Sequence, residues 1–174
     1  MRARLPVLAA ALAVVACAGT PRGAPGGAGD GAPHASQVSI TGLDGGTTAL
    51  GAVLGSKPAL VSFWAPWCEP CVRELPQLER LAQAAGPCGA AVLGVAVGER
   101  PESIGPFCRA RHLTFPQYTD ESFALADALG QRRIPAIVVF DRAGAIVYKG
   151  DALDARATAA LAAASGGGSN CALR

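Results

Sequence analysis

Two cysteines, Cys68 and Cys71, stand three positions apart in the segment WAPWCEPCVRELP, at the predicted start of a helix. Such a pair can hold a metal ion, form a structural disulfide or exchange electrons with another disulfide. At a helix N-terminus, free backbone N–H groups and the helix dipole favour a thiolate and lower the pKa of its thiol. We therefore predict that Cys68 is a nucleophile and that Cys71, one turn later, resolves the mixed disulfide that the nucleophile forms.

A metal-binding module that uses the same two thiolates is the competing interpretation. Structural zinc sites need a second close cysteine pair or a histidine pair. Here Cys88 and Cys108 are far apart in the sequence, and His112 has no neighbouring histidine. We predict no metal site and no cofactor, and a copper or zinc carrier built on Cys68 and Cys71 stays as the alternative.

The N-terminal segment is typical of an export signal. Residues 5–16 are strongly apolar, follow Arg2 and Arg4, and are too few to cross a bilayer. The segment ends in VVAC, which resembles the lipobox of bacterial lipoproteins and would make Cys17 the lipidated first residue of the mature chain. We therefore predict a lipoprotein-type signal peptide over residues 1–17. The alternative is an ordinary signal peptide that happens to contain a cysteine.

Composition divides the rest of the chain into a linker, a domain and a tail. Residues 18–36 offer few apolar side chains to bury and are predicted to form a flexible Gly/Pro/Ala linker. Residues 37–164 are predicted to form one domain, and residues 165–174 a glycine-rich tail. The net charge of +2 is small, and the basic residues are scattered rather than clustered. Both observations argue against a nucleic-acid partner.

Strands and helices alternate in the predicted domain, which indicates an α/β fold with a mostly parallel sheet covered on both faces. The short apolar runs 59–64 and 91–97 indicate buried strands, whereas the apolar residues of 69–85 recur at helical spacing. The other predicted elements are a hairpin of residues 37–40 and 47–50, helices over 102–112 and 121–129 (capped by Asp120), a hairpin of 137–140 and 145–148, and a last helix capped by Asp151 that ends near Ala164.

The segment FWAPWCEPCVRELPQL resembles the active-site segment of the TlpA/ResA-like branch of the thioredoxin superfamily. The resemblance covers about residues 37–164 and includes RRIPAIVVFDRAGAIVYKG near the end of the domain. It implies a thioredoxin fold, with a mixed central sheet flanked by helices and an N-terminal β-hairpin extension. Members of this branch are exported thiol-disulfide oxidoreductases.

The resemblance also implies roles for residues around the cysteine pair. The Ile134–Pro135 bond would be cis and face the disulfide, with its backbone pairing with the substrate chain. Glu74 would exchange a proton with the resolving thiol, although a glutamate is favoured early in any helix by the dipole. Trp67 would form the rim on which a partner docks, with Pro70 beside it.

Three cysteines remain after this assignment. Cys88 precedes the second buried strand and Cys108 lies late in the helix that returns antiparallel to it, so both are expected at the sheet end opposite the active site. A structural Cys88–Cys108 disulfide is therefore predicted, with two inert buried thiols as the alternative. Cys171 in the tail then has no assigned partner. It could form a disulfide with Cys88 or Cys108, form an intermolecular disulfide, or stay a free thiol.

The resemblance implies a monomeric reductase on the periplasmic side of the bacterial cell envelope, lipid-anchored to the membrane if Cys17 is acylated. Electrons would come from a membrane thiol donor of the DsbD/CcdA kind. Protein disulfides would be the substrates, which in the family include those of apocytochrome c and of copper-centre assembly proteins. The alternatives are a thiol oxidase of the same fold and a non-catalytic thioredoxin-fold interaction lipoprotein.

Overall fold

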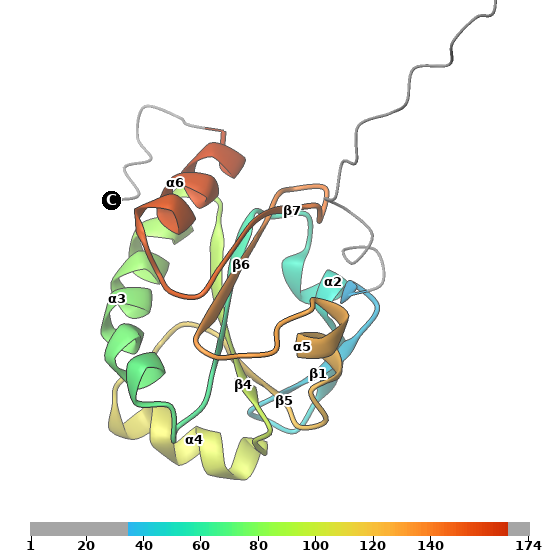
Figure 1. Ribbon diagram of the computed structural model, residues 1–174, viewed down its shortest axis with the longest axis vertical. Helices are drawn as coiled ribbons and strands as arrows, with labels where there is room; N and C mark the ends of the chain where they lie inside the picture. The colour runs from blue at the N-terminus through green and yellow to red at the C-terminus, as the bar shows by residue number, and fades with distance from the viewer. Residues whose placement is uncertain (1–34, 167–174) are drawn as a thin grey trace, which may run out of the picture.

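The computed structural model describes residues 35–166 and contains one mixed β-sheet in this range (Figure 1). Its strands are β1 (Ser39–Gly42), β2 (Thr47–Ala49), β3 (Ala59–Trp64), β4 (Ala91–Val97), β5 (Gln117–Asp120), β6 (Ala136–Phe140) and β7 (Ile146–Gly150). The helical elements are α2 (Leu50–Leu54), α3 (Glu69–Ala85), the 3-10 turn η1 (Gly86–Cys88), α4 (Pro101–Ala110), α5 (Ala124–Ala128) and α6 (Ala155–Ala164).

The strands lie in the order β2-β1-β5-β4-β3-β6-β7. At the centre, β3 pairs in parallel with β4 and antiparallel with β6, and β4 pairs in parallel with β5. The β1–β2 hairpin joins the sheet through an antiparallel pairing of β1 with β5. This arrangement confirms the predicted α/β class and the thioredoxin fold with its N-terminal hairpin, but the expectation of a mostly parallel sheet is wrong, because four of the six strand pairings are antiparallel.

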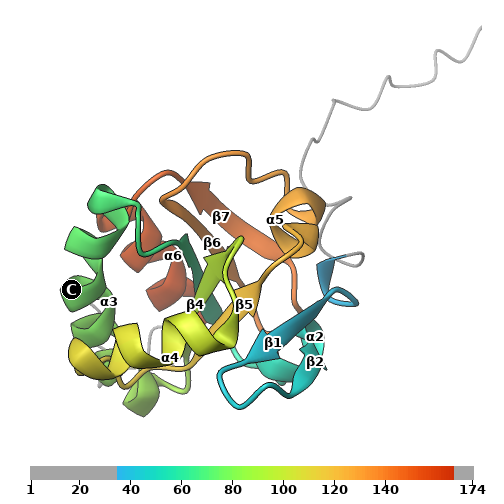
Figure 2. The same cartoon turned by 90° about the horizontal axis from the view of Figure 1, so that it is seen from below.

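Helices cover both faces of the sheet, as the second view of the molecule shows (Figure 2). Helices α3, α4 and α6 pack against one face, and α2 and α5 against the other. Because side chains alternate along a strand, β3 sends Leu60 and Trp64 into the first core and Val61 and Phe63 into the second. Every residue of β3 is buried, so the segment that leaves its end starts from a fixed position.

Helix α3 follows from its sequence pattern. Its apolar side chains at helical spacing, Leu75, Leu78 and Leu81, are all buried against the sheet. The helix begins at Glu69 as predicted and runs without a break through Pro76. It therefore holds the cysteine pair in its first turn against a large apolar face.

Strand β5 was not predicted. Its sequence, QYTD, is polar, yet three of its four residues are buried because it fills the gap between β1 and β4. Helix α5 is shorter than the predicted 121–129: it begins only at Ala124, and Asp120 reaches over the intervening loop to accept a hydrogen bond from Ala126 N–H at 2.9 Å. Residues 121–123, which were predicted to form the first turn of this helix, therefore form a loop between β5 and α5.

Several predicted boundaries are wrong by one to a few residues, among them those of β1, α4 and β7. The cap of α6 is Asp154 rather than Asp151, since Asp154 accepts the hydrogen bond of Ala157 N–H at 2.8 Å. Ala35, expected in the linker, is fully buried, and Ser36 O accepts a hydrogen bond from Gly51 N–H at 2.8 Å. The folded part therefore includes the last two residues assigned to the linker.

The predicted signal peptide, the lipidation site Cys17, most of the linker and Cys171 lie outside the described residues. Within residues 35–166, no helix has both the length and the apolar character that crossing a membrane requires.

Candidate active site

Cys68 and Cys71 form a disulfide at the start of α3, with their Cα atoms 5.3 Å apart. Cys68 is the N-cap residue of the helix, and its Sγ accepts a hydrogen bond from Cys71 N–H at 3.3 Å. The first N–H groups of a helix have no partner inside it, so a sulfur at this position satisfies one of them. After reduction the same N–H group and the helix dipole stabilise a Cys68 thiolate.

The two sulfurs differ in access to solvent. Cys68 keeps 6% of its surface exposed and Cys71 only 1%, within the core under α3. Trp67, directly before Cys68, is 68% exposed. A partner that approaches along Trp67 therefore meets Cys68 first, and the nucleophilic role of Cys68 stays a prediction.

Glu74 lies one helical turn after Cys71 on the same helix. Its Oε1 accepts a hydrogen bond from Leu153 N–H at 3.0 Å, and its Oε2 is buried with no hydrogen-bond partner in the described part of the chain. Burial raises the pKa of the Glu74 carboxyl, and the Leu153 hydrogen bond opposes this effect. A carboxyl whose protonated form is favoured in this way is suited to exchanging a proton with a nearby thiol.

Replacing Glu74 with glutamine should change the pH dependence of folding stability. Because burial raises the pKa of Glu74 in the folded chain, the folded state binds this proton more tightly than the unfolded state. The stability of the wild type relative to Glu74→Gln should therefore be greatest below the ordinary pKa of 4.5 and fall as the pH rises through the raised value. Urea unfolding of both proteins between about pH 4 and pH 8 measures this difference.

The matched control for this measurement is Glu102→Gln, which removes an exposed carboxyl in the first turn of α4. Its stability difference from the wild type should not show the fall expected at Glu74. A Glu74→Gln difference that is constant across the range, or that grows with pH, would contradict the burial of this carboxyl.

The loop before β6 lies beside the cysteine pair. Ala136, the first residue of β6, pairs with Phe63 near the end of β3, so the preceding Ile134 and Pro135 lie next to the segment that leads to Cys68. The Ile134–Pro135 peptide bond is cis, as predicted. Ile134 and Trp67 line the same pocket, whereas Pro70 is exposed in the first turn of α3 and does not line it.

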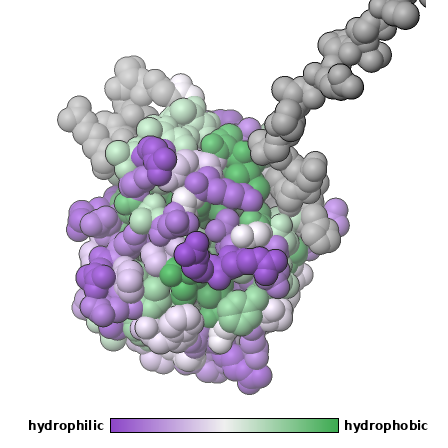
Figure 3. Space-filling model, in the orientation of Figure 1, coloured by the Kyte–Doolittle hydropathy of each residue, from purple (hydrophilic) through white to green (hydrophobic). Residues whose placement is uncertain are grey.

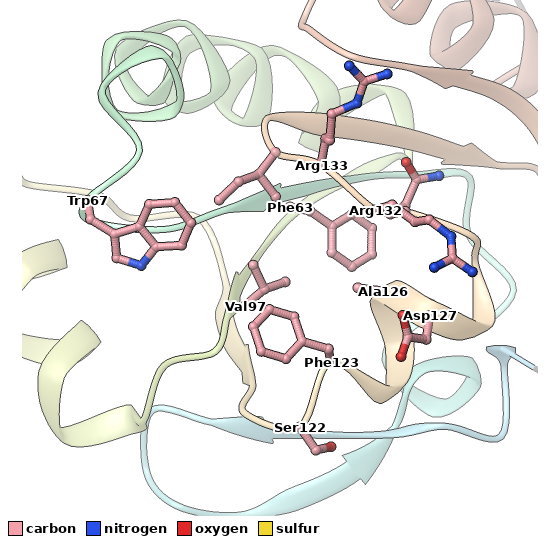
Figure 4. Close-up of a pocket in the computed structure, with 11 residues that line it drawn as sticks. Phe63, Trp67, Val97, Ser122, Phe123, Ala126, Asp127, Arg132 and Arg133 are labelled. Atoms are coloured by element: carbon pink, nitrogen blue, oxygen red, sulfur yellow. The ribbon is translucent and has the colours of Figure 1, made fainter.

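This pocket has a volume of about 560 Å³, and one of the residues that line it is Trp67, which directly precedes Cys68 (Figure 4). Trp67 and Phe123 stand on opposite sides of it, Val97 lies between them, and the Phe63 ring lies across from Phe123. Its other lining residues are Ser122, Ala126, Asp127, Gln131, Arg132, Arg133 and Ile134. We refer to it below as the Trp67–Phe123 groove.

Sequence reasoning missed most of this groove. Phe123 was assigned to a helix, but it precedes α5 in a left-handed conformation with φ of 63°. Val97 was seen only as the end of a buried strand. The pair Arg132 and Arg133, which directly precedes Ile134–Pro135 in the RRIP segment, is the sequence signal that indicates a charged rim.

The predicted Cys88–Cys108 disulfide is wrong. Cys108 is a free, buried thiol, and Cys88 is disulfide-bonded but not to Cys108. Burial explains the difference: α4 turns Cys108 into the core, whereas Cys88 is only half-buried, in the η1 turn after α3. A bridge between Cys88 and Cys171, one of the alternatives from the sequence, stays a prediction.

Trp64 at the end of β3 is buried and tied to its surroundings. Its indole Nε1 donates a hydrogen bond to Gln117 Oε1 at 3.1 Å, and its ring packs on Phe107 with the centroids 5.3 Å apart. It is thus a core residue, and Trp67 is the exposed aromatic of the pair. In residues 35–166, no three His, Cys, Asp or Glu side chains are grouped so that they could hold a metal ion.

Comparison with protein families places most of the chain in one of them. Residues 27–161 match the family described as Redoxin. Among curated proteins, the chain is similar to the thiol-disulfide oxidoreductase ResA of Geobacillus thermodenitrificans, with 31% identity over 90 residues, or 52% of each chain. It is also similar to ResA of Bacillus subtilis, with 27% identity over 94 residues, 54% of this chain and 52% of that one. The aligned part spans about half the length of these relatives.

Some solved structures have folds similar to that of this chain. One is a secreted Mycobacterium tuberculosis disulfide oxidoreductase homologous to E. coli DsbE, with 25% identity, a TM-score of 0.63, and coverage of 75% of this chain and 98% of that one. Another is MTB DsbF in mixed oxidised and reduced forms, with 27% identity, a TM-score of 0.66, and coverage of 76% and 98%.

Proposed function

Since the chain belongs to the Redoxin family and is a TlpA/ResA-like protein of the thioredoxin family, we propose that it is a thiol-disulfide oxidoreductase acting on disulfides of other proteins. One observation carries the proposal. The Cys68–Cys71 disulfide caps α3, where Cys68 Sγ accepts the Cys71 N–H hydrogen bond, and it lies beside an exposed tryptophan and an open groove.

The reaction needs only the groups of this site and a disulfide substrate. In the reduced protein, the Cys68 thiolate attacks one sulfur of the substrate disulfide; the other sulfur leaves as a thiolate, and a mixed disulfide forms. Cys71 then loses its proton, for which Glu74 is the proposed acceptor, and attacks Cys68 Sγ. The second substrate thiolate leaves, the Cys68–Cys71 disulfide is restored, and two electrons have passed to the substrate.

We further propose that the protein works as a reductase in the bacterial cell envelope, anchored through a lipid on Cys17. The resemblance of the active-site segment supports this direction, and a similar solved protein is described as secreted. Its electrons would come from a membrane thiol donor of the DsbD/CcdA kind. Cysteines of apocytochrome c or of metal-centre assembly proteins are the proposed substrates.

The reduction potential of the Cys68/Cys71 couple tests the direction of electron flow. For a reductase we expect a value near or below that of thioredoxin, about −270 mV, in graded dithiothreitol buffers. A double Cys68→Ser/Cys71→Ser variant of the full chain identifies signals from the other cysteines. A value near about −120 mV would instead indicate an oxidase, and the absence of a reversible couple would favour the metal carrier or the non-catalytic module.

A further inference from the structure

The Trp67–Phe123 groove has a buried apolar floor and two exposed aromatic side chains at its edges. Phe63 and Val97 form its base, and Phe123 remains 45% exposed at its edge. Trp67, which is 68% exposed, lines the same groove, and exposed apolar side chains that are grouped in this way, rather than scattered singly, indicate a binding surface. In the space-filling view, green apolar surface lies between purple hydrophilic areas in the lower half of the visible face (Figure 3).

The backbone holds Phe123 in place at this edge. Its φ of 63° is a left-handed conformation that a residue with a bulky side chain rarely adopts. The ring lies against Gly98, where an added Cβ would be only 2.7 Å from Phe123 Cζ. A glycine at this position thus leaves room for the ring, and the loop presents one face of Phe123 to the groove rather than to the core.

Two arginines form the rim of the groove and are not neutralised by the protein. Arg132 and Arg133 are both exposed, and neither forms a salt bridge with any carboxylate of residues 35–166. Asp127, the acidic residue among those that line the groove, lies at the end near Arg132 (Figure 4). Among the described residues, positive charge therefore remains unbalanced on the side of Arg133, next to Ile134.

Acidic residues near the groove are engaged elsewhere. Glu69, which follows Cys68, forms an ion pair with Arg73 one turn along α3. Glu121, in the loop before Phe123, forms an ion pair with Arg100. The groove thus combines an apolar pocket with a cationic rim, and one of its walls is Trp67, the residue directly before the nucleophilic Cys68.

We propose that this groove selects substrate polypeptides in which a large apolar side chain and acidic residues lie beside the reactive cysteine. The apolar side chain enters between Trp67 and Phe123, and the carboxylates face Arg133 and Arg132. The inference rests on the proposed function and adds a substrate class to it. Because both arginines are exposed, each carboxylate should add a several-fold preference that weakens with salt.

A set of short peptides tests this selectivity with the full-length reduced protein. Each peptide carries one cysteine as a mixed disulfide with mercaptoethanol, and the protein returns a peptide thiol, free mercaptoethanol and its own Cys68–Cys71 disulfide. The peptides differ only beside the cysteine, where a Phe is followed by two Glu, two Gln or two Lys. We expect the second-order rate constant to be about tenfold larger for Glu than for Lys at low salt, with Gln between them.

Variants of the chain separate local recognition from overall charge. Arg132→Gln/Arg133→Gln should bring the Glu-to-Lys ratio close to one. The matched control Arg80→Gln/Arg142→Gln removes the same charge from exposed sites, late in α3 and in the turn after β6 at the opposite end of the sheet, and should keep the ratio. A fourth peptide, with Ala in place of the Phe before the two Glu, should react more slowly with the wild type, and Phe123→Ala should remove this preference for Phe over Ala.

The outcomes distinguish the two levels of the proposal. If the reduced protein fails to reduce even hydroxyethyl disulfide, the proposed function itself is wrong. If it reduces hydroxyethyl disulfide but treats the three peptides alike, the substrate class is wrong and the function stands. The substrate class is also overturned if both double variants lower the ratio equally, because overall charge then explains the preference.

Discussion

Replacing Cys68 with serine should abolish disulfide exchange, lowering the rate of substrate reduction by about a thousandfold or more. The thiolate is the attacking group, and a serine hydroxyl neither ionises near neutral pH nor forms a disulfide. The serine would keep the N-cap position of α3, since its oxygen can accept the Cys71 N–H hydrogen bond that the sulfur accepts now. The loss should therefore appear in activity, with little change in the free energy of unfolding of the reduced proteins.

The companion variant Cys71→Ser should behave differently. Cys68 can still attack a substrate disulfide, but no second thiol is present to release the product, so a covalent protein–substrate adduct should accumulate. Mass spectrometry under non-reducing conditions measures the adduct in both variants. An adduct with Cys68→Ser and none with Cys71→Ser would mean that the roles of the two cysteines are reversed.

Cys108 supplies a matched control in the same experiment. It is free and buried, and burial raises the pKa of its thiol to about 11, so at neutral pH it is almost entirely protonated and inaccessible. Cys108→Ala should keep the exchange activity and form no stable adduct. Loss of exchange in this variant would place a third sulfur in the reaction.

The central parts of the fold were predictable because local sequence and tertiary environment agree there. The runs that became β3 and β4 are apolar at nearly every position, as strands buried on both faces must be. Helix α3 carries its leucines at helical spacing, and its start is marked by the cysteine pair. For these elements the hydrophobic pattern alone was sufficient.

Strand β5 could not be predicted from sequence, because its polar residues favour an exposed position and yet three of the four are buried. Gln117 and Asp120 are polar residues that are buried by neighbouring strands and that hydrogen-bond to Trp64 and to Ala126, far along the chain or across a loop. Nothing within a short window of sequence indicates such partners. The cap of α6 was missed for a simpler reason, since Asp151 and Asp154 are equally good caps from sequence alone.

The same distinction applies to the candidate site. Cys68, Cys71 and the Ile134–Pro135 pair could be found because they form short motifs. The groove beside them could not be predicted. Phe123 lines it only because its backbone is left-handed and because Gly98, which has no side chain, leaves room for the ring. Chemistry that is encoded locally was readable, whereas the surface that would choose a substrate depends on which loops meet in three dimensions.

Replacing Gly94 with alanine should destabilise the folded domain by about 2–3 kcal/mol, even though alanine is usually the better strand residue. Gly94 in β4 pairs with Gln117 in β5, and the glutamine side chain folds over it. An added Cβ would lie 2.0 Å from Gln117 Oε1 and 2.7 Å from Gln117 Cδ. The amide would have to move, and the buried Trp64 Nε1–H would lose its acceptor.

The cause of this loss can be isolated with Gln117→Ala, which removes the side chain that the new methyl group meets. In that background Gly94→Ala should be neutral or stabilising by up to about 1 kcal/mol, because only the lower entropy of the unfolded chain remains. Urea unfolding of the four proteins gives a coupling free energy of about 2–3 kcal/mol between the two sites. Additive effects would mean that the amide moves aside freely.

The same substitution should change the fluorescence of Trp64, which is the last residue of the strand that leads to Cys68. The chain has two tryptophans, so in a Trp67→Phe background the fluorescence comes from Trp64 alone. Gly94→Ala should change this emission in the folded protein, and Gln117→Ala should change it in a similar way, since both remove the hydrogen bond to the indole. If Gly94→Ala lowers stability but leaves the emission unaltered, Gln117 has kept its bond to Trp64, and the destabilisation comes from the strands themselves.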